Sequence, residues 1–139
     1  MQFYSLNKQA PEVDFKEAAI NGQAPDGGLY FPSAVPQVKK ELINQIENYS
    51  NEEIAFEIIH PYVCNTIPEE ELLRIVNETV NFPIPLVGVT ENIFSLELFH
   101  GPTLAFKDIG ARFMSRCLGY FVTHSTSLRA TDKKLTHCL

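Results

Sequence analysis

Residues 92–121 constrain the fold more than any other part of this sequence, because they predict a strand, a tight turn and a long helix in succession. Apolar residues alternate over residues 92–99 as in a half-buried strand, and Gly101 and Pro102 then interrupt the pattern. A helix is expected to begin near Ala105, with apolar residues at helical spacing: Phe106, Ile109, Phe113, Met114, Cys117, Leu118 and Phe121. We therefore expect a βα unit and an α/β fold, with any small-molecule site at the turn.

The first third of the chain predicts one short helix and one tight turn. Residues 13–22 have helical spacing, with Asp14 as the expected N-cap and Gly22 as the expected stop. The run Pro-Asp-Gly-Gly that follows predicts a turn in which Gly27 or Gly28 takes a positive φ. Both features come from local backbone chemistry and need no tertiary information.

The middle of the chain, from residue 38 to residue 79, is helical in pattern. Two capping boxes mark expected helix starts, one formed by Ser50 and Glu53 and the other by Thr66 and Glu69. Two prolines then end this region before the predicted strand, as in a linker or an edge strand. The region before the strand is therefore expected to be mostly helical.

Composition excludes several classes of protein. The 139 residues carry 17 acidic and 11 basic side chains, a net charge of -6, and no cluster of arginine and lysine suits a nucleic-acid backbone. No apolar run approaches the roughly 20 residues of a membrane span. The first residues lack the basic and apolar regions of a secretion signal, so the expected compartment is the cytoplasm.

The sequence offers little support for a metal site or a disulfide framework. Three acidic residues, Glu69 to Glu71, are best explained by a first helical turn, where carboxylates favour the helix dipole. The cysteines Cys64, Cys117 and Cys138 are widely spaced and form no CxxC motif. We expect reduced thiols, with Cys64 and Cys117 buried, and no metal.

Lys107 is the candidate catalytic residue, and two interpretations of it remain open. A lysine in a helix is most often a solvated surface residue, and His100 is most often a turn residue bonded to backbone. However, Lys107 is expected in the first turn of its helix beside the apolar Phe106 and Leu104, and both surroundings disfavour an ammonium ion. A neutral amine is the nucleophile that forms a Schiff base with an aldehyde.

The sequence LELFHGPTLAFKD, residues 96–108, resembles the segment of the threonine synthase family that carries its pyridoxal 5'-phosphate (PLP) lysine. APDGGLYFP, residues 24–32, and DIGARFMSR, residues 108–116, are similar to the same family. The likeness extends from about residue 1 to about residue 121. It is long enough to make chance an improbable explanation.

The resemblance implies a small, mostly helical N-terminal domain over residues 1–82. Residues 83–121 would begin a PLP domain of the tryptophan-synthase-β-like fold (fold type II). The implied reaction converts O-phospho-L-homoserine and water to L-threonine and phosphate, with Lys107 holding PLP and then moving protons. Residues 100–103 would shape the cofactor turn and Thr103 would cap the helix, whereas the dipole suffices to explain Asp108.

Residues 122–139 differ from the rest of the chain. In the family, a glycine-rich turn of the SGDTG type follows the lysine helix and cradles the cofactor phosphate. The last 18 residues contain no glycine and carry a net charge of +2, against -8 for residues 1–121. We interpret them as a non-family tail, which is either the out-of-frame end of an interrupted coding sequence or the native end of a reduced relative. The alternative to an enzyme is therefore an inactive fragment, or an interaction module that pairs with a complementary chain through the exposed side of the helix over residues 106–121. The same exposed apolar face is expected to allow self-association.

Overall fold

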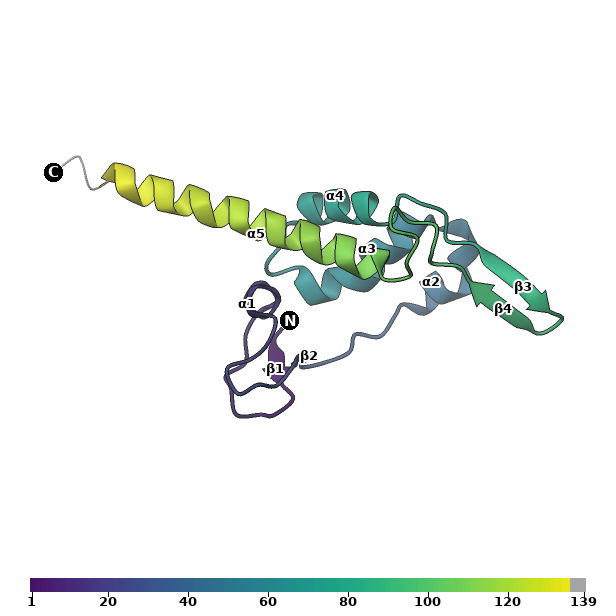
Figure 1. The fold of residues 1–139 in the computed structure, drawn as a ribbon, viewed down its shortest axis with the longest axis horizontal. Coiled ribbons are helices and arrows are strands. Elements are labelled where there is room, and N and C mark those ends of the chain that lie inside the picture. Colours follow the sequence, from purple (N-terminus) through teal and green to yellow (C-terminus); the bar gives the residue numbers. More distant parts are fainter. Residues whose placement is uncertain (136–139) are drawn as a thin grey trace.

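The computed structural model describes the backbone of residues 1–135 and the side chains of residues 1–124. Helices dominate this part of the chain, with two small antiparallel sheets, β1–β2 and β3–β4 (Figure 1). The elements in chain order are β1 (Phe3–Ser5), α1 (Phe15–Asn21), β2 (Tyr30–Pro32), α2 (Lys40–Asn44), the 3-10 turn η1 (Ile46–Asn48), α3 (Asn51–Val63), α4 (Glu69–Thr79), β3 (Leu86–Thr90), β4 (Ile93–Leu96) and α5 (Asp108–Leu135).

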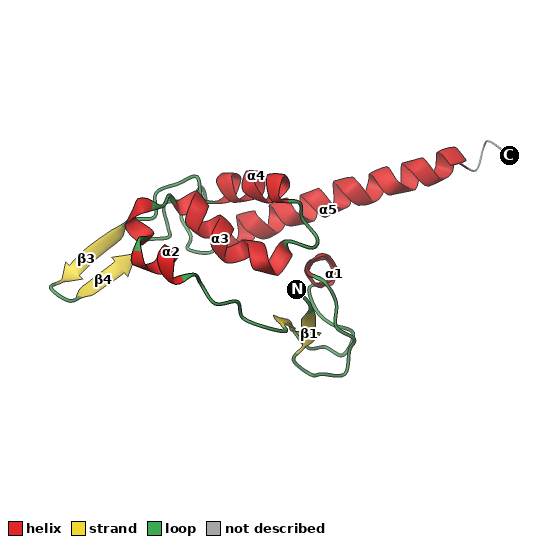
Figure 2. Cartoon of the chain, turned by 180° about the vertical axis from the view of Figure 1, so that it is seen from behind, coloured by secondary structure: helices red, strands yellow, loops and turns green. Residues whose placement is uncertain are grey.

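The N-terminal unit, β1, α1 and β2, confirms the local predictions. Asp14 caps α1, since its carboxylate accepts a hydrogen bond from the Glu17 N–H at 2.8 Å. Gly22 ends the helix with φ of 68°, and Gly27 takes φ of 81° in the following turn. Figure 2 shows this unit set apart from the β3–β4 hairpin, with the helices α3, α4 and α5 between them.

Asp26 ties together the loops of this unit. Its carboxylate accepts hydrogen bonds from the Ser5 hydroxyl at 2.6 Å, the Gly28 N–H at 2.9 Å and the Gln9 N–H at 2.9 Å. A side chain at Gly28 would lie 2.0 Å from the Ser5 hydroxyl oxygen, so this position requires glycine. The Ser5 bond, followed by the backbone bonds, lowers the pKa of Asp26 below its ordinary value of 3.8 against a smaller opposing effect of burial.

Of the two expected capping boxes, one is confirmed and the other is wrong. The Ser50 hydroxyl accepts from the Glu53 N–H at 3.2 Å, and the Glu53 carboxylate accepts from the Ser50 N–H at 2.8 Å. Thr66 instead donates its hydroxyl to the Val63 carbonyl at 2.9 Å, at the end of the preceding helix. The N-cap of α4 is Pro68, because a proline disfavours helical geometry in the residue before it and so moves the helix start forward.

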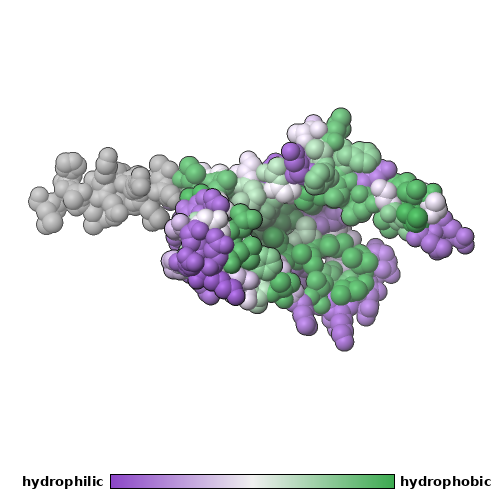
Figure 3. All heavy atoms as spheres, turned by 60° about the horizontal axis from the view of Figure 1, so that its bottom comes forward, coloured by the Kyte–Doolittle hydropathy of each residue, from purple (hydrophilic) through white to green (hydrophobic). Residues whose placement is uncertain are grey.

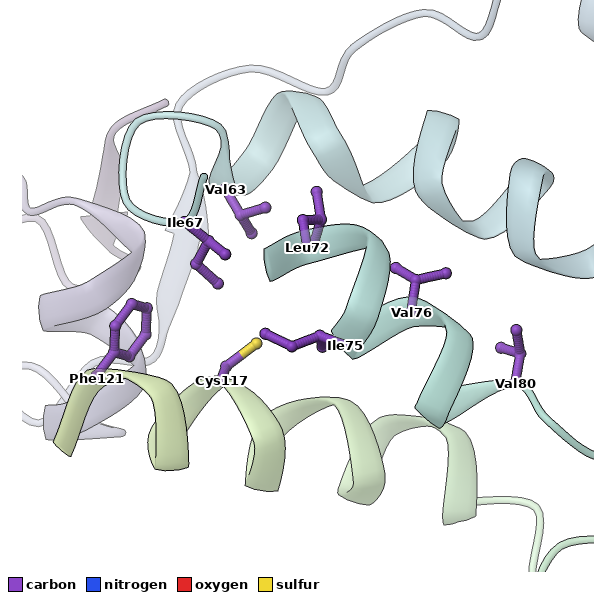
Figure 4. Close-up of a cluster of buried hydrophobic side chains, with 8 residues drawn as sticks. All are labelled: Val63, Ile67, Leu72, Ile75, Val76, Val80, Cys117 and Phe121. Atoms are coloured by element: carbon purple, nitrogen blue, oxygen red, sulfur yellow. The ribbon is translucent and has the colours of Figure 1, made fainter. Parts of the chain in front are cut away.

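The main core lies where α3, α4 and α5 meet, and Figure 4 shows its side chains pointing toward one another. Its buried members are Val63, Ile67, Leu72, Ile75, Val76, Val80, Cys117 and Phe121. The Phe15 ring of α1 lies 6.1 Å from the Phe121 ring and 6.3 Å from the Phe113 ring, between centroids, so α1 closes on α5. The apolar face that was expected to be exposed on the lysine helix is thus partly covered: α4 and α1 bury Cys117 and Phe121, whereas Phe106 stays exposed. The residues between them stay half-buried: Ile109, Phe113, Met114 and Leu118.

The expected burial of two cysteines is half right. Cys117 is fully buried against the α4 side of the core, and burial raises the pKa of its thiol to about 12. Cys64 is exposed, because it follows the last residue of α3 at the surface. Cys138 lies outside the described residues.

The expected strand over residues 92–99 forms only as β4, which pairs antiparallel with β3 from Leu86 opposite Leu96 to Thr90 opposite Ile93. Among residues 1–135, β4 has no parallel partner, so the strand, turn and helix are present without the sheet that a βα unit normally joins. Both faces of the hairpin are exposed. A green, apolar surface covers much of this end of the molecule in Figure 3.

None of the helices in the described part of the chain has the length and hydropathy that crossing a membrane requires. Helix α5 is the longest of them, and its sequence carries charged residues toward both ends.

We predict that Asp26→Asn removes a pH-dependent part of the stability. Because the pKa of Asp26 is lowered on folding, its contribution is fully present above the unfolded pKa of about 3.9 and is lost as the pH falls through the folded pKa. The difference in the free energy of unfolding between wild type and variant should shrink as urea titrations move below about pH 4. The exposed Glu12→Gln is the control, and a difference independent of pH would contradict the assignment.

Candidate active site

Lys107 lies immediately before α5, at the N-cap position. Its carbonyl accepts the Ala111 N–H at 2.9 Å, the first hydrogen bond of the helix, and its side chain is exposed. The helix begins at Asp108 and not near Ala105, because residues 101–107 form two tight turns. The helix therefore begins about three residues later than expected, and Lys107 lies just before its first turn, still at the positive end of the helix dipole.

Two backbone hydrogen bonds close these turns. The Leu104 N–H donates to the Gly101 carbonyl at 3.0 Å, and the Asp108 N–H donates to the Ala105 carbonyl at 3.0 Å. Leu104 has φ of 57°, in the left-handed region that a leucine rarely adopts, and its side chain is 76% exposed. Phe106 is 73% exposed, so the apolar surroundings expected around Lys107 are not formed by the described residues.

The carboxylate of Asp108 is buried beneath this turn, with 3% of the residue exposed. It accepts the Thr103 N–H at 2.9 Å, and its other oxygen accepts the Thr103 hydroxyl. The Thr103 hydroxyl, followed by backbone hydrogen bonds and the charge of Arg112, lowers the pKa of Asp108 despite the opposing effect of burial. Thr103 is thus not the helix cap that the sequence suggested, since its hydroxyl donates to a side chain inside the helix.

Gly101 is the residue that makes room for this carboxylate. A Cβ atom at Gly101 would lie 2.5 Å from the nearer Asp108 oxygen and 3.0 Å from the Asp108 Cβ. The glycine is required here for close approach, because its φ is not in the left-handed region.

His100 pairs with a side chain and not with backbone, contrary to expectation. Its Nε2 lies 2.7 Å from a carboxylate oxygen of Glu97, and its ring lies 4.7 Å from the Phe99 ring, between centroids. The His100–Glu97 pair lies just before the turn of residues 101–107, whereas α5 follows directly after that turn. No contact in the structure brings His100 to Lys107.

Arginine side chains hold the start of α5 against the end of α4. Arg112 donates to the Glu78 carbonyl and, at 2.6 Å, to the Asn81 side-chain oxygen. Arg116 donates from Nε to the Glu78 carboxylate at 2.7 Å, and Arg74 donates to the other oxygen of that carboxylate at 2.8 Å. The bonds from Arg116 and Arg74 lower the pKa of Glu78, and together with those of Arg112 they fix the helix on which the lysine turn is mounted.

An apolar groove of about 440 Å³ lies beside the start of α5. Sequence reasoning did not anticipate it, because its walls come from segments far apart in the chain. No charged side chain lines the groove, so it suits an apolar occupant and not a phosphorylated substrate. The lining residues are Asn51, Ile54, Ala55, Ile58, Ile59, Val76, Thr79, Val80, Ile84, Leu96, Leu98, Ile109, Gly110 and Phe113.

No metal centre is formed within the described side chains, because they contain no group of three histidine, cysteine or acidic residues arranged to hold an ion. The candidate site of the described chain is therefore the lysine turn, residues 100–108.

Comparisons with known proteins identify the family. The profile described as "Threonine synthase N terminus" matches residues 2–80. Threonine synthase of Haemophilus influenzae is 39% identical over 118 residues, which cover 85% of this chain and 27% of that protein. Threonine synthase of Escherichia coli is 35% identical over 118 residues, covering 85% of this chain and 28% of that protein.

Solved structures agree with the sequence relatives. The crystal structure of PLP-bound threonine synthase from Brucella melitensis matches 91% of this chain and 28% of that chain, with a TM-score of 0.86 and 37% identity. The Escherichia coli threonine synthase structure matches 88% of this chain with a TM-score of 0.81. The α/β fold is that of the N-terminal region of these enzymes, and the chain belongs to the threonine synthase family. It spans between a quarter and a third of the length of the relatives it matches.

We predict that Gly101→Ala destabilises the chain by about 1–3 kcal/mol, because the new methyl group would overlap the buried Asp108 carboxylate. Gly119→Ala is the matched control, since Gly119 lies inside α5 with nothing within 4 Å of a new Cβ. That control should instead stabilise the helix by about 0.5–1 kcal/mol. Urea titration of both variants measures the effects, and equal shifts would contradict the close approach.

Proposed function

We propose that this chain provides the N-terminal domain and the cofactor lysine, Lys107, of a threonine synthase. The reaction proposed is the conversion of O-phospho-L-homoserine and water to L-threonine and phosphate. The observation that carries the proposal is the exposed amine of Lys107 at the N-terminus of α5, on a turn fixed from both sides. The PLP-bound relative from Brucella melitensis supports the choice of cofactor.

The residues of the lysine turn fit the covalent part of cofactor binding. The amine of Lys107 is exposed and has no ion-pair partner among the described residues, so the aldehyde of the cofactor can reach it. PLP supplies, when bound, a conjugated ring that stores the negative charge left when carbon-bound protons are removed. The glycine-rich phosphate cradle that the family places after the lysine helix has no counterpart in this sequence.

The chemical role proposed for Lys107 has two parts. Its amine first binds the cofactor and then, once released, holds and moves protons above the reacting carbons. A long, flexible side chain on a fixed backbone can reach successive positions, which this reaction requires because protons leave two carbons before phosphate departs. The division into residues 1–82, 83–121 and 122–139, and the assignment of the second part to a tryptophan-synthase-β-like domain, belong to the same proposal.

A second candidate function is a noncatalytic module that self-associates, and the exposed hairpin favours it. Leu86, Val89, Ile93, Phe94 and Leu96 are each 57–65% exposed. Among the described residues, the outer edges of β3 and β4 are unpaired, and such edges readily pair with another strand. A second copy of the chain offers the same edge and the same apolar faces, which allows a closed symmetric contact.

The cofactor proposal predicts one labelled lysine. The full chain, mixed with PLP, reduced with borohydride and mapped by peptide mass spectrometry, should carry about one label, at Lys107. Lys107→Ala should lose it, whereas Lys40→Ala, which removes an exposed lysine at the start of α2, should not. Labelling spread over Lys39, Lys40 and the lysines of residues 122–139, and unchanged in Lys107→Ala, would reject the proposal. Phosphate release from O-phospho-L-homoserine then tests the reaction itself.

The self-association proposal predicts a concentration-dependent increase in mass by sedimentation. Phe94→Lys should shift the equilibrium to monomer by placing a charge on the hairpin, since a desolvated charge at such a contact is costly. Ile43→Lys alters a residue that is similarly exposed, 57% against 59%, on α2 and should leave the equilibrium unchanged. A monomer at every concentration would exclude this function.

A further inference from the structure

We propose that Asp108 is a positioning residue for Lys107. Its buried carboxylate fixes the turn of residues 101–107 and so sets the backbone position from which the Lys107 side chain extends into solvent. This inference rests on the proposed role of Lys107 in cofactor binding. Nothing in the family comparison assigns a role to Asp108.

The helix dipole does not account for the position of this carboxylate. An acidic residue in a first turn needs only to lie near the helix N-terminus, and Glu69 to Glu71 satisfy that condition on α4 while Glu69 and Glu70 stay exposed. Asp108 is 97% buried, and burying a charge is costly unless hydrogen bonds compensate for the lost water. The compensating bonds come from the Thr103 hydroxyl and N–H and from the Ala105 backbone, and both residues lie outside the helix. The carboxylate therefore stabilises the turn.

The turn needs such a clamp because its backbone is strained. Leu104 lies between the two ends of the clamp, Thr103 and Asp108, and holds φ of 57° with an almost fully solvated side chain. Its own side-chain contacts therefore cannot compensate for the strain, and strained residues persist only where the surroundings over-determine them. The missing side chain at Gly101 admits the carboxylate to this position.

The clamp fixes the backbone of Lys107 while leaving its side chain mobile. The peptide group that joins Lys107 to Asp108 is held at both of its polar atoms, because the Asp108 N–H donates to the Ala105 carbonyl and the Lys107 carbonyl accepts the Ala111 N–H. Arg112, one turn along α5, contributes only its charge to Asp108, because its guanidinium is bonded to Glu78 and Asn81. A lysine that must bind a cofactor and then transfer protons requires a backbone position that is fixed in this way.

Thr103 variants separate the clamp from the helix dipole. Thr103→Val removes the hydroxyl but leaves the charge of Asp108 in place, and Thr103→Ser restores the hydroxyl. Asp108→Asn keeps the shape but replaces one accepting oxygen with an amide nitrogen that cannot accept. If Asp108 acts only on the dipole, Asp108→Asn alone should have an effect, and the two Thr103 variants should behave like wild type.

The first measurement is amide hydrogen exchange of Thr103, Leu104 and Asp108 in the full chain without cofactor. We expect exchange about tenfold faster in Thr103→Val and Asp108→Asn, and wild-type exchange in Thr103→Ser, because one buried hydrogen bond is lost and restored. Exchange in α4 should be unchanged in all three variants. Unchanged exchange at the turn in Thr103→Val, or acceleration throughout the chain, would overturn the inference.

The second measurement is the ratio of borohydride-trapped PLP label at Lys107 to that at Lys40. The ratio should fall about tenfold in Thr103→Val and Asp108→Asn and recover in Thr103→Ser. An unchanged ratio with faster exchange at the turn would show that the clamp does not position the lysine and would overturn the inference. If wild type takes no label at Lys107, the cofactor proposal and this inference about its lysine both fail, whereas labelled wild type with unresponsive variants rejects the inference alone.

Discussion

The packing of α5 against α4 and α1 supports every other feature of this structure. Cys117 and Phe121 point from α5 into the core, and burying a side chain as large as Phe121 contributes about 1.5–3 kcal/mol. Phe15 brings the N-terminal unit onto the same helix. The polar bonds of Arg112 and Glu78 fix how α5 is oriented against α4. They contribute little to the free energy of folding, because part of each side chain remains in water. The lysine turn is thus mounted on an element held from two sides.

The candidate site combines a rigid turn with an exposed amine. The buried carboxylate of Asp108, the absent side chain of Gly101 and the strained backbone of Leu104 depend on one another, so none of the three can be understood alone. The exposed hairpin beside this turn has the opposite character, since both of its faces are apolar and unpartnered among the described residues. The lysine turn, which suggests covalent chemistry, and the β3–β4 hairpin, which suggests association, therefore lie next to each other in the chain.

The sequence could predict features that local chemistry determines. The positive φ of Gly22 and Gly27 followed from the lack of a side chain at each turn. The capping box expected at Thr66 failed because Pro68, two residues later, moves the helix start. Nothing local indicated that Asp108 would turn away from solvent, since an acidic residue in a first turn has a sufficient explanation on the surface. The partners of α5 were missed for a related reason: contacts across long sequence separations leave no pattern in a single sequence.

The aromatic contact between Phe15 and Phe121 has a consequence for the order of folding. The two rings are separated by almost the whole family-like part of the chain, so the N-terminal unit completes its packing only after α5 has been synthesised. Until then, the apolar side chains of α1, α3 and α4 that face α5 remain open to water. Pairings of such long sequence separation form slowly, because loop closure must precede the contact. A nascent chain of this protein is therefore exposed to aggregation until α5 has been synthesised and covers these side chains.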